Sequence, residues 1–374
     1  MLLPSRQSLR VPWKGLSVRL DASNVRALAR GCAVLGAGGG GDPGLGLAMA
    51  LLAIAETGPV EVVDVAALAA DRLVMPCGMV GAPAIADERM WNGSEGAVLR
   101  DAVERLHGAP VGAFMCLGIG GANGLLPVTW AARAGLPLVD ADGMGRTFSH
   151  LEKQTMSLAG LTVSPVVLTD GRGNIVRLQG VDDAWAEHLA RGAAASLGGV
   201  CAGALACMSG EQARSAVIQG SLSLAVRLGE AMGTGELGAS IAGIGEALDG
   251  VVLIQGTVVD LERHADRRHA RGSVTIRGNG PDAGRQLRLE LQSEFLLVIE
   301  DGVVCAAVPD IICLLAPDTG DPVASERLRY GQAVAVMAAP APAVWHTAAG
   351  LELAGPRAFG YDVDHVPIEG TAAP

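Results

Sequence analysis

The sequence predicts an α/β fold, in which an N-terminal three-layer α/β/α domain with a largely parallel sheet precedes a C-terminal β-barrel-like domain. Two patterns carry this prediction. In the first half, short apolar runs alternate with longer segments of helical periodicity, and from residue 251 onward strand-like runs follow one another closely. The chain has 374 residues, and 50% of them are hydrophobic, which suffices for two domains with sizeable cores.

The first half contains apolar runs that are typical of buried strands, each followed closely by glycine or proline. These runs are 32–35, 73–75, 111–117 and 136–139. Between them, segments 44–56 and 95–106 have the composition and periodicity of helices. Short strands separated by helices indicate a parallel sheet covered on both sides.

The pattern changes after residue 160. Runs 166–169 and 174–178 flank a glycine-rich turn and predict a hairpin, and 182–232 is mostly helical with breaks at Gly198-Gly199 and Ser209-Gly210. The remaining runs predict the strands of a small barrel or sandwich: 251–261, 272–277, 285–291, 296–300, 303–308, 311–315 and 332–338. We therefore expect an α/β domain at 1–169, and at 170–374 a helical segment followed by the β-barrel-like domain.

Composition narrows the function. The net charge is −11 and the basic residues are scattered, so we expect no nucleic-acid partner. The seven cysteines form no CxxC pair, which favours reduced, buried thiols. No apolar run approaches the length of a bilayer span and the N-terminus has no signal-peptide core, so we expect a soluble, cytoplasmic protein with no membrane partner. The expected partner is a small heterocyclic molecule, and we leave open whether the chain forms a homo-oligomer.

Glycine is concentrated directly after the four predicted strands of the first half, at 36–43, 78–83, 118–124 and 140–146. In an open parallel sheet these loops share the carboxyl edge, where ligands bind. Backbone N–H groups at such loops can approach a ligand closely. We expect the substrate to contact Gly38, Gly39, Gly40, Gly41, Gly120 and Gly121.

The first of these loops partly resembles a nucleotide-binding GxGxxG motif. It lacks a GK[ST] ending and an acidic residue at the ribose distance, and the Asp42 carboxylate at the helix start would repel a phosphate. Asp42-Pro43 also has the form of an ordinary helix cap. We expect a bound carboxylate or polar heterocycle rather than a nucleotide, with a tight turn and cap as the purely structural alternative.

The densest titratable cluster of the first half comprises Asp140, Asp142, Arg146, His150 and Glu152. We expect one of the two aspartates to be buried and the other to face a ligand. The cluster could supply a general base, an acid and an anion clamp, or bind a hard metal ion, so a divalent metal ion is one candidate cofactor. The alternative is a structural Arg–Asp pair beside a capped helix.

Other polar residues are less distinctive. The Asn123 amide can both donate and accept, which suits an imide or amide ring, although asparagine is also common in loops of this kind. His346 and His365 are isolated in the sequence and suggest no role.

Several stretches together resemble the S-methyl-thiohydantoin desulfurase family, long catalogued as a domain of unknown function and associated with hydantoin metabolism. They are GAGGGGDPGLG at 36–46, GMVGAP at 78–83, GIGGANGLLP at 118–127, LPLVDADGMGR at 136–146, VPDIICLL at 308–315, ERLRYGQAVAV at 326–336 and GPRAFGYDVDHVP at 355–367. The resemblance implies the same two-domain fold. It also implies hydrolysis of a 2-(methylthio)imidazolone ring to hydantoin and methanethiol.

The resemblance leads to a mechanism in a cleft between the domains. Asp142 or Asp140 would be the base or a metal ligand, Arg146 would clamp a substrate carboxylate, and Asn123 with the 38–41 N–H groups would orient the ring. Asp42 would be a second acid or only a cap. The main alternative is a non-catalytic ligand-binding or accessory subunit in hydantoin metabolism.

Two places depart from the family pattern. Where the family is expected to have an FPEL-like run, this chain has Phe148-Ser149-His150-Leu151, so a histidine replaces a carboxylate at position 150 and an acid follows at Glu152. In the second domain, 292–295 reads QSEF where an Asn-Glu-Asn-like run is expected. A change of specificity or chemistry is the expected consequence if position 150 contacts substrate or metal.

Overall fold

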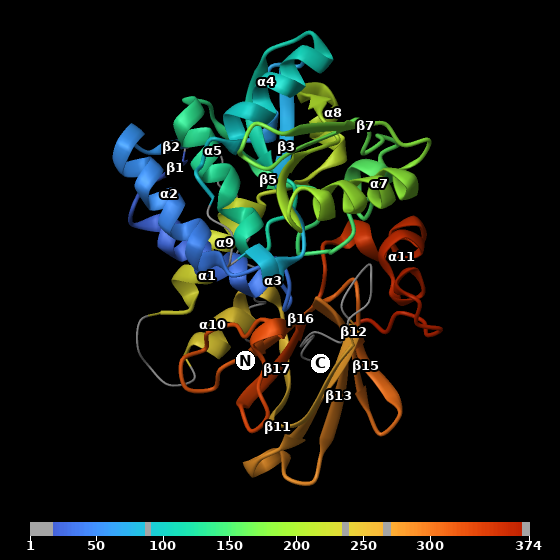
Figure 1. Ribbon diagram of the computed structural model, residues 1–374. Coiled ribbons are helices and arrows are strands. Elements are labelled where there is room, and N and C mark those ends of the chain that lie inside the picture. Colours follow the sequence, from blue (N-terminus) through green and yellow to red (C-terminus); the bar gives the residue numbers. More distant parts are fainter. Residues whose placement is uncertain (1–17, 87–90, 234–238, 265–270, 369–374) are drawn as a thin grey trace, which may run out of the picture.

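The structure, a computed structural model, describes residues 18–86, 91–233, 239–264 and 271–368. Within these ranges it contains a mixed sheet A flanked by helices and a curled antiparallel half-barrel, sheet B (Figure 1). This confirms the predicted fold class. No helix within the described ranges is long and apolar enough to cross a bilayer.

Sheet A has the strand order β1-β2-β5-β4-β3-β8-β6-β7, and its central members β2, β5, β4 and β3 run parallel. The outer strands pair antiparallel. The strands are β1 (Val18–Leu20), β2 (Val60–Val63), β3 (Leu73–Gly81), β4 (Val111–Cys116), β5 (Leu138–Asp142), β6 (Val166–Thr169), β7 (Ile175–Leu178) and β8 (Val200–Ala204), with short β9 (Met208–Ser209) and β10 (Ile218–Gln219) at the margins.

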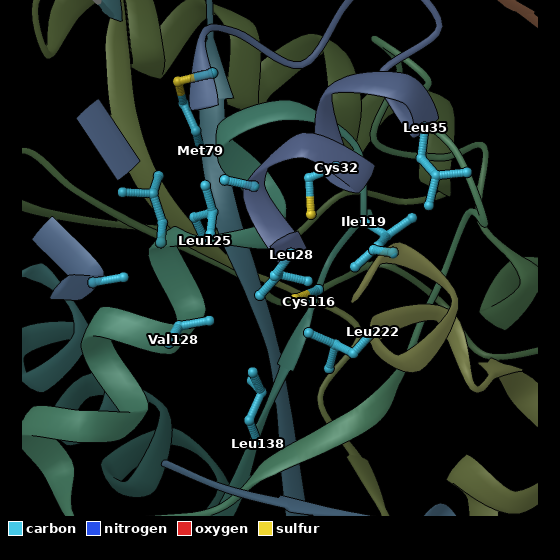
Figure 2. Close-up of a cluster of buried hydrophobic side chains, with 14 of the residues drawn as sticks. Leu28, Cys32, Leu35, Met79, Cys116, Ile119, Leu125, Val128, Leu138 and Leu222 are labelled. Atoms are coloured by element: carbon cyan, nitrogen blue, oxygen red, sulfur yellow. The ribbon is translucent and has the colours of Figure 1, made fainter. Parts of the chain in front are cut away.

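Helices cover both faces of sheet A and enclose two separate apolar cores. On one face lie α1 (Asn24–Leu35), α2 (Pro43–Thr57), α4 (Glu95–His107), α5 (Leu126–Ala134) and α9 (Ser221–Ala231); on the other lie α7 (Asp183–Ser196) and α8 (Gly210–Ala216). The short helices are α3 (Pro83–Ala86) and α6 (Thr155–Leu158). Figure 2 shows Leu28 and Cys32 of α1 packed with Cys116, Leu222 and Ile119 in the first core.

Three local predictions were wrong. The run 32–35 is the last turn of α1, because Val25, Leu28 and Cys32 are buried at helical spacing. The glycine-rich stretch 36–42 therefore joins two helices instead of following a strand. The stretch 78–81 continues β3, where it pairs with β8, and 200–204, which lies in the segment expected to be mostly helical, is that β8.

Sheet B has the order β15-β14-β13-β12-β11-β17-β16 and a core of its own. Its strands are β11 (Val251–His264), β12 (Arg271–Gly278), β13 (Gln286–Gln292), β14 (Glu294–Glu300), β15 (Val303–Ala307), β16 (Ile311–Leu315) and β17 (Ala333–Ala339). Each lies in or overlaps a predicted strand. Helices α10 (Ala239–Leu248) and α11 (Ala348–Ala354) precede and follow the sheet. The seven cysteines form no disulfide, and five are buried.

Candidate functional site

The glycine-rich loops at 36–42 and 118–124 lie against each other. The Ala122 N–H donates to the Gly40 carbonyl at 3.0 Å. A Cβ atom added to Gly121 would come within 2.4 Å of the Gly40 oxygen, so only glycine permits this approach. Glycines of both loops therefore serve close packing between them.

Asn123 fixes the same loop to sheet A. Its Oδ1 accepts a hydrogen bond from the Met79 N–H of β3 at 2.6 Å. Because Gly78 lies beside this oxygen, a Cβ atom there would approach it to 2.8 Å. The stretches around residues 40, 79 and 121 thus form one connected region.

Asp142 is fully buried and organises the loop that follows β5. Its Oδ2 accepts the N–H groups of Ile119 at 2.9 Å, Met144 at 3.0 Å and Gly145 at 2.8 Å. Burial raises the pKa of Asp142 to about 6, although these donors pull it down. The carboxyl group holds loops 118–121 and 142–145 together.

Asp140 accepts hydrogen bonds from the N–H of Ser223 at 3.0 Å and from its hydroxyl, at the start of α9. Residues two apart on a strand share a face, and Asp142 also faces the start of α9, through Ser221. Both aspartates therefore face the start of α9, and no strand alternation divides them into a buried and a ligand-facing residue. Neither residue lines the cavity described below.

Arg146 is completely buried and connects the two sheets. It donates to the carbonyl oxygens of Thr147, Phe295, Pro309 and Asp310. Burial lowers its pKa to about 10, opposed by the negative charges of Glu294 and Asp310. These contacts hold the guanidinium on backbone carbonyls of the C-terminal half.

A cavity of about 280 Å³ lies beside the first glycine-rich loop, and we call it the Gly-loop cavity. Three parts of the chain form its walls: the first glycine-rich loop together with the start of α2, one face of α1, and segment 321–327. The lining residues are Arg26, Ala29, Arg30, Ala33, Gly38, Gly39, Gly41, Asp42, Pro43, Gly44, Leu47, Asp321, Pro322, Val323, Ala324 and Arg327. Four of the predicted site residues, Gly38, Gly39, Gly41 and Asp42, therefore lie at one cavity.

The Asp42 side chain, at the N-cap of α2, is fixed by two interactions. Its Oδ1 caps the helix by accepting the Gly44 N–H at 2.8 Å, and Pro43 occupies the first helical position, as the sequence predicts. Its Oδ2 receives Arg327 Nη2 at 2.5 Å. The Gly38 carbonyl accepts the Ser325 N–H at 2.9 Å, so the C-terminal half closes over the loop.

Sequence reasoning missed three arginines at this cavity: Arg26, Arg30 and Arg327. Arg30 is engaged with the end of α9, where it donates to the Gly233 carbonyl at 2.7 Å. Arg26 is exposed on α1. Arg327 lies within the ERLRYGQAVAV stretch that carries the family resemblance, and this was the one signal in the sequence that pointed to it.

His150 and Glu152 form a second cluster with Glu187 of α7. His150 Nδ1 lies 3.2 Å from Glu152 Oε1, and one ligand atom from each of the three residues falls within 4.8 Å of the others. Burial raises the pKa of Glu152, but the hydrogen bond and charge of His150 outweigh it and hold the pKa below its usual value. Glu187 is already paired with Arg191 at 2.6 Å.

Glu294 connects this second cluster to the Gly-loop cavity. Its fully buried carboxyl accepts the N–H of Ser149 at 3.0 Å, and burial raises its pKa. On the other side, a Cβ atom on Gly39 would lie 3.3 Å from the Glu294 Cβ. The predicted residues thus divide into a cavity group, a buried scaffold group and the His150 cluster behind the loop.

Comparisons with known proteins agree with this architecture. A family model described as S-Me-THD-like, N-terminal domain, matches residues 23–180, and one described as S-Me-THD-like, C-terminal domain, matches 181–368. The crystal structure of a protein from Chromobacterium violaceum has a similar fold, with a TM-score of 0.77 and 24% identity over 94% of this chain and 100% of that chain. No curated protein matched.

Proposed function

This chain belongs to the S-Me-THD-like family, and from that premise we propose that it is a hydrolase that converts an S-methyl-thiohydantoin, or a closely related methylthio-imidazolone, to hydantoin and methanethiol. One observation carries the proposal: the Gly-loop cavity takes its walls from both matched halves, with Asp42 from the first and Arg327 from the second. Enzymes commonly bind small molecules in such junctions.

The cavity favours a small anionic ring as its occupant. Its volume of about 280 Å³ lies at the small end of the roughly 300–1,000 Å³ typical of ligand pockets, which suits one five-membered ring with a short side chain. Arg26 and Arg327 lie in its wall, and guanidinium groups bind carboxylates well. A ring that carries a carboxylate side chain fits both features.

In the proposed reaction, water attacks the ring carbon that bears the methylthio group. Asp42 accepts one proton as the C–O bond forms and returns it to sulfur as the C–S bond breaks, so that methanethiol leaves. The other water proton moves to the ring nitrogen, and the product is the hydantoin carbonyl. Arg327 orients the Asp42 carboxylate, and backbone N–H groups of the loop stabilise developing negative charge.

Asp140, Asp142, Arg146 and Asn123 act as positioning residues in this scheme. They hold the segments that pack behind the cavity wall, through the hydrogen bonds to Ser223, Ile119, Phe295 and Met79. This replaces their assignment as base, clamp and ring-binding group. The chemistry then rests on Asp42, whose side chain reaches the cavity.

The test is an assay of thiol release from S-methyl-thiohydantoins with and without a carboxylate side chain, run with and without added divalent metal ions. The proposal expects catalytic methanethiol release, with the carboxylated compound preferred. Tight binding of these compounds by calorimetry with no thiol release would contradict it and favour a non-catalytic binding or accessory subunit.

A further inference from the structure

A cluster of Asp310, His346 and His365 lies apart from the Gly-loop cavity. Asp310 is in the turn between β15 and β16, His346 ends the 3-10 turn Ala343–His346, and His365 is in the extended segment near the C-terminus. His346 Nε2 lies 2.7 Å from Asp310 Oδ1, and His365 Nε2 lies 2.9 Å from Asp310 Oδ2. The three groups come from positions up to 55 residues apart.

The buried Asp310 carboxylate requires a compensating positive charge. It is fully buried, and a buried carboxylate is costly unless positive charge or strong donors surround it. Its side-chain partners are the two imidazoles, and the Ala341 N–H donates to Oδ1 at 2.9 Å. The neighbouring Arg146 guanidinium donates to the Asp310 peptide oxygen, on the backbone side of this residue.

We propose that Asp310, His346 and His365 bind one divalent transition-metal ion of the zinc class. Two imidazole nitrogens and one carboxylate oxygen are donors that zinc accepts, whereas magnesium and calcium prefer oxygen alone. The three ligand atoms already lie within 4.8 Å of one another, so small side-chain shifts bring them to the ~2.0–2.2 Å distances of zinc coordination.

Accessibility also favours this site. The His346 side chain is 33% exposed whereas those of His365 and Asp310 are 6% and 0% exposed, which leaves one open side for entry and for a fourth ligand. Asp362 and Asp364, close to His365 in sequence, are exposed and form ion pairs with Arg357. The His150–Glu152–Glu187 cluster has a similar ligand set, but the Arg191 guanidinium already neutralises Glu187.

Bound metal would fasten three segments that are distant in sequence. The ion would tie the segment around His365 and the turn ending at His346 to the start of β16. None of the three ligands lines the Gly-loop cavity, so the expected effect of the metal is on stability and not on substrate binding. A ligand that binds the folded state preferentially raises the melting temperature.

The experiment uses the full chain after treatment with a chelator. Zn²⁺ is titrated by calorimetry and thermal melting, and Co²⁺ by visible absorption, whose d–d bands report the coordination geometry of the bound ion. The proposal expects one equivalent to bind, with a rise in melting temperature. Replacing His346→Gln or His365→Gln should weaken binding at least about tenfold.

Two control variants identify the site. His188→Gln alters an exposed histidine on α7 whose ring packs edge-on against the Trp185 ring, and it should bind like the unaltered chain. His150→Gln should also retain binding. The proposal is overturned if the chain binds no equivalent, if the double variant His346→Gln/His365→Gln retains binding, or if His150→Gln alone abolishes it. Melting curves of the metal-free variants verify that each one folds. If His365→Gln does not fold, His346→Gln still tests the site, because the His346 side chain is partly exposed.

Discussion

Arg327 donates to the carboxylate of Asp42 at 2.5 Å and so joins the first turn of α2 to a segment 285 residues later in the chain. The same carboxylate caps α2 through Gly44. Asp42 is therefore fixed in orientation at the wall of the Gly-loop cavity, where the proposed reaction needs a base. The predictions below test this arrangement and the scaffold that supports it.

Asp42→Asn should lower kcat for thiol release by about 10²–10⁴-fold, because the amide cannot accept the water proton. Asparagine caps helices about as well as aspartate, so the melting temperature should change little. Calorimetric measurement of substrate affinity in the variant separates loss of chemistry from loss of binding. The account expects affinity within a few-fold of the original.

Asp64→Asn is the matched control for this variant. Like Asp42, Asp64 is an N-cap: it caps the 3-10 turn Val65–Ala67 by accepting the Ala66 N–H at 2.7 Å, and it does not line the cavity. Its substitution should leave thiol release unchanged. Equal activity in both variants would remove Asp42 from the mechanism.

Arg26→Gln should raise KM about tenfold for a carboxylated substrate with little change in kcat, because the proposed contact is the same in the ground and transition states. The effect should vanish for the analogue without a carboxylate. Arg105→Gln, at an exposed arginine in the last turn of α4, is the control. Equal sensitivity of both substrates to Arg26→Gln would show that the guanidinium does not bind the carboxylate.

Gly40→Ala should destabilise the fold more than Gly58→Ala. Both glycines have positive φ, +83° and +95°, which costs an alanine roughly 1–2 kcal/mol. At Gly40 the new Cβ would also come within 2.6 Å of the Gly120 oxygen, whereas no atom lies within 4 Å at Gly58. Urea denaturation should show an additional loss of about 1–3 kcal/mol for Gly40→Ala. Equal losses would mean that the two loops do not pack closely.

Asp142 should make stability depend on pH between about 4 and 6. Burial raises its folded-state pKa to about 6, so the folded state binds a proton more tightly than the unfolded state. Its stabilising contribution is then full below the unfolded pKa and is lost as pH rises through about 6. Relative to Asp142→Asn, the unaltered chain should lose on the order of 1–3 kcal/mol of unfolding free energy over this interval. Parallel pH profiles for the two proteins would refute the shifted pKa.

Most of the fold follows from local patterns. Alternating apolar runs and helices predict three strands of the parallel centre of sheet A, β3, β4 and β5, but not β2, and the closely spaced runs after residue 251 predict sheet B. The error at 32–35 arose because a four-residue apolar run has no period of its own, and its helical spacing is visible only together with Val25 and Leu28. The strand β8 was missed because its small residues resemble an alanine-rich helix.

The site was less predictable because its contacts are distant in sequence. Asp42 could be placed at a helix start from Asp-Pro alone, but its partner Arg327 is paired only by the tertiary fold. The glycines were expected to surround a ligand, and Gly40 and Gly121 instead lie against each other. His346 and His365 suggest no role in sequence, because only the turn at Asp310 brings them together.

The most direct measurement is a crystal structure of the Asp42→Asn variant soaked with a carboxylated S-methyl-thiohydantoin. The account predicts intact substrate in the Gly-loop cavity, with its carboxylate at Arg26 and its methylthio carbon facing residue 42. Substrate bound elsewhere, or an empty cavity at a concentration that saturates the protein in solution, would contradict it.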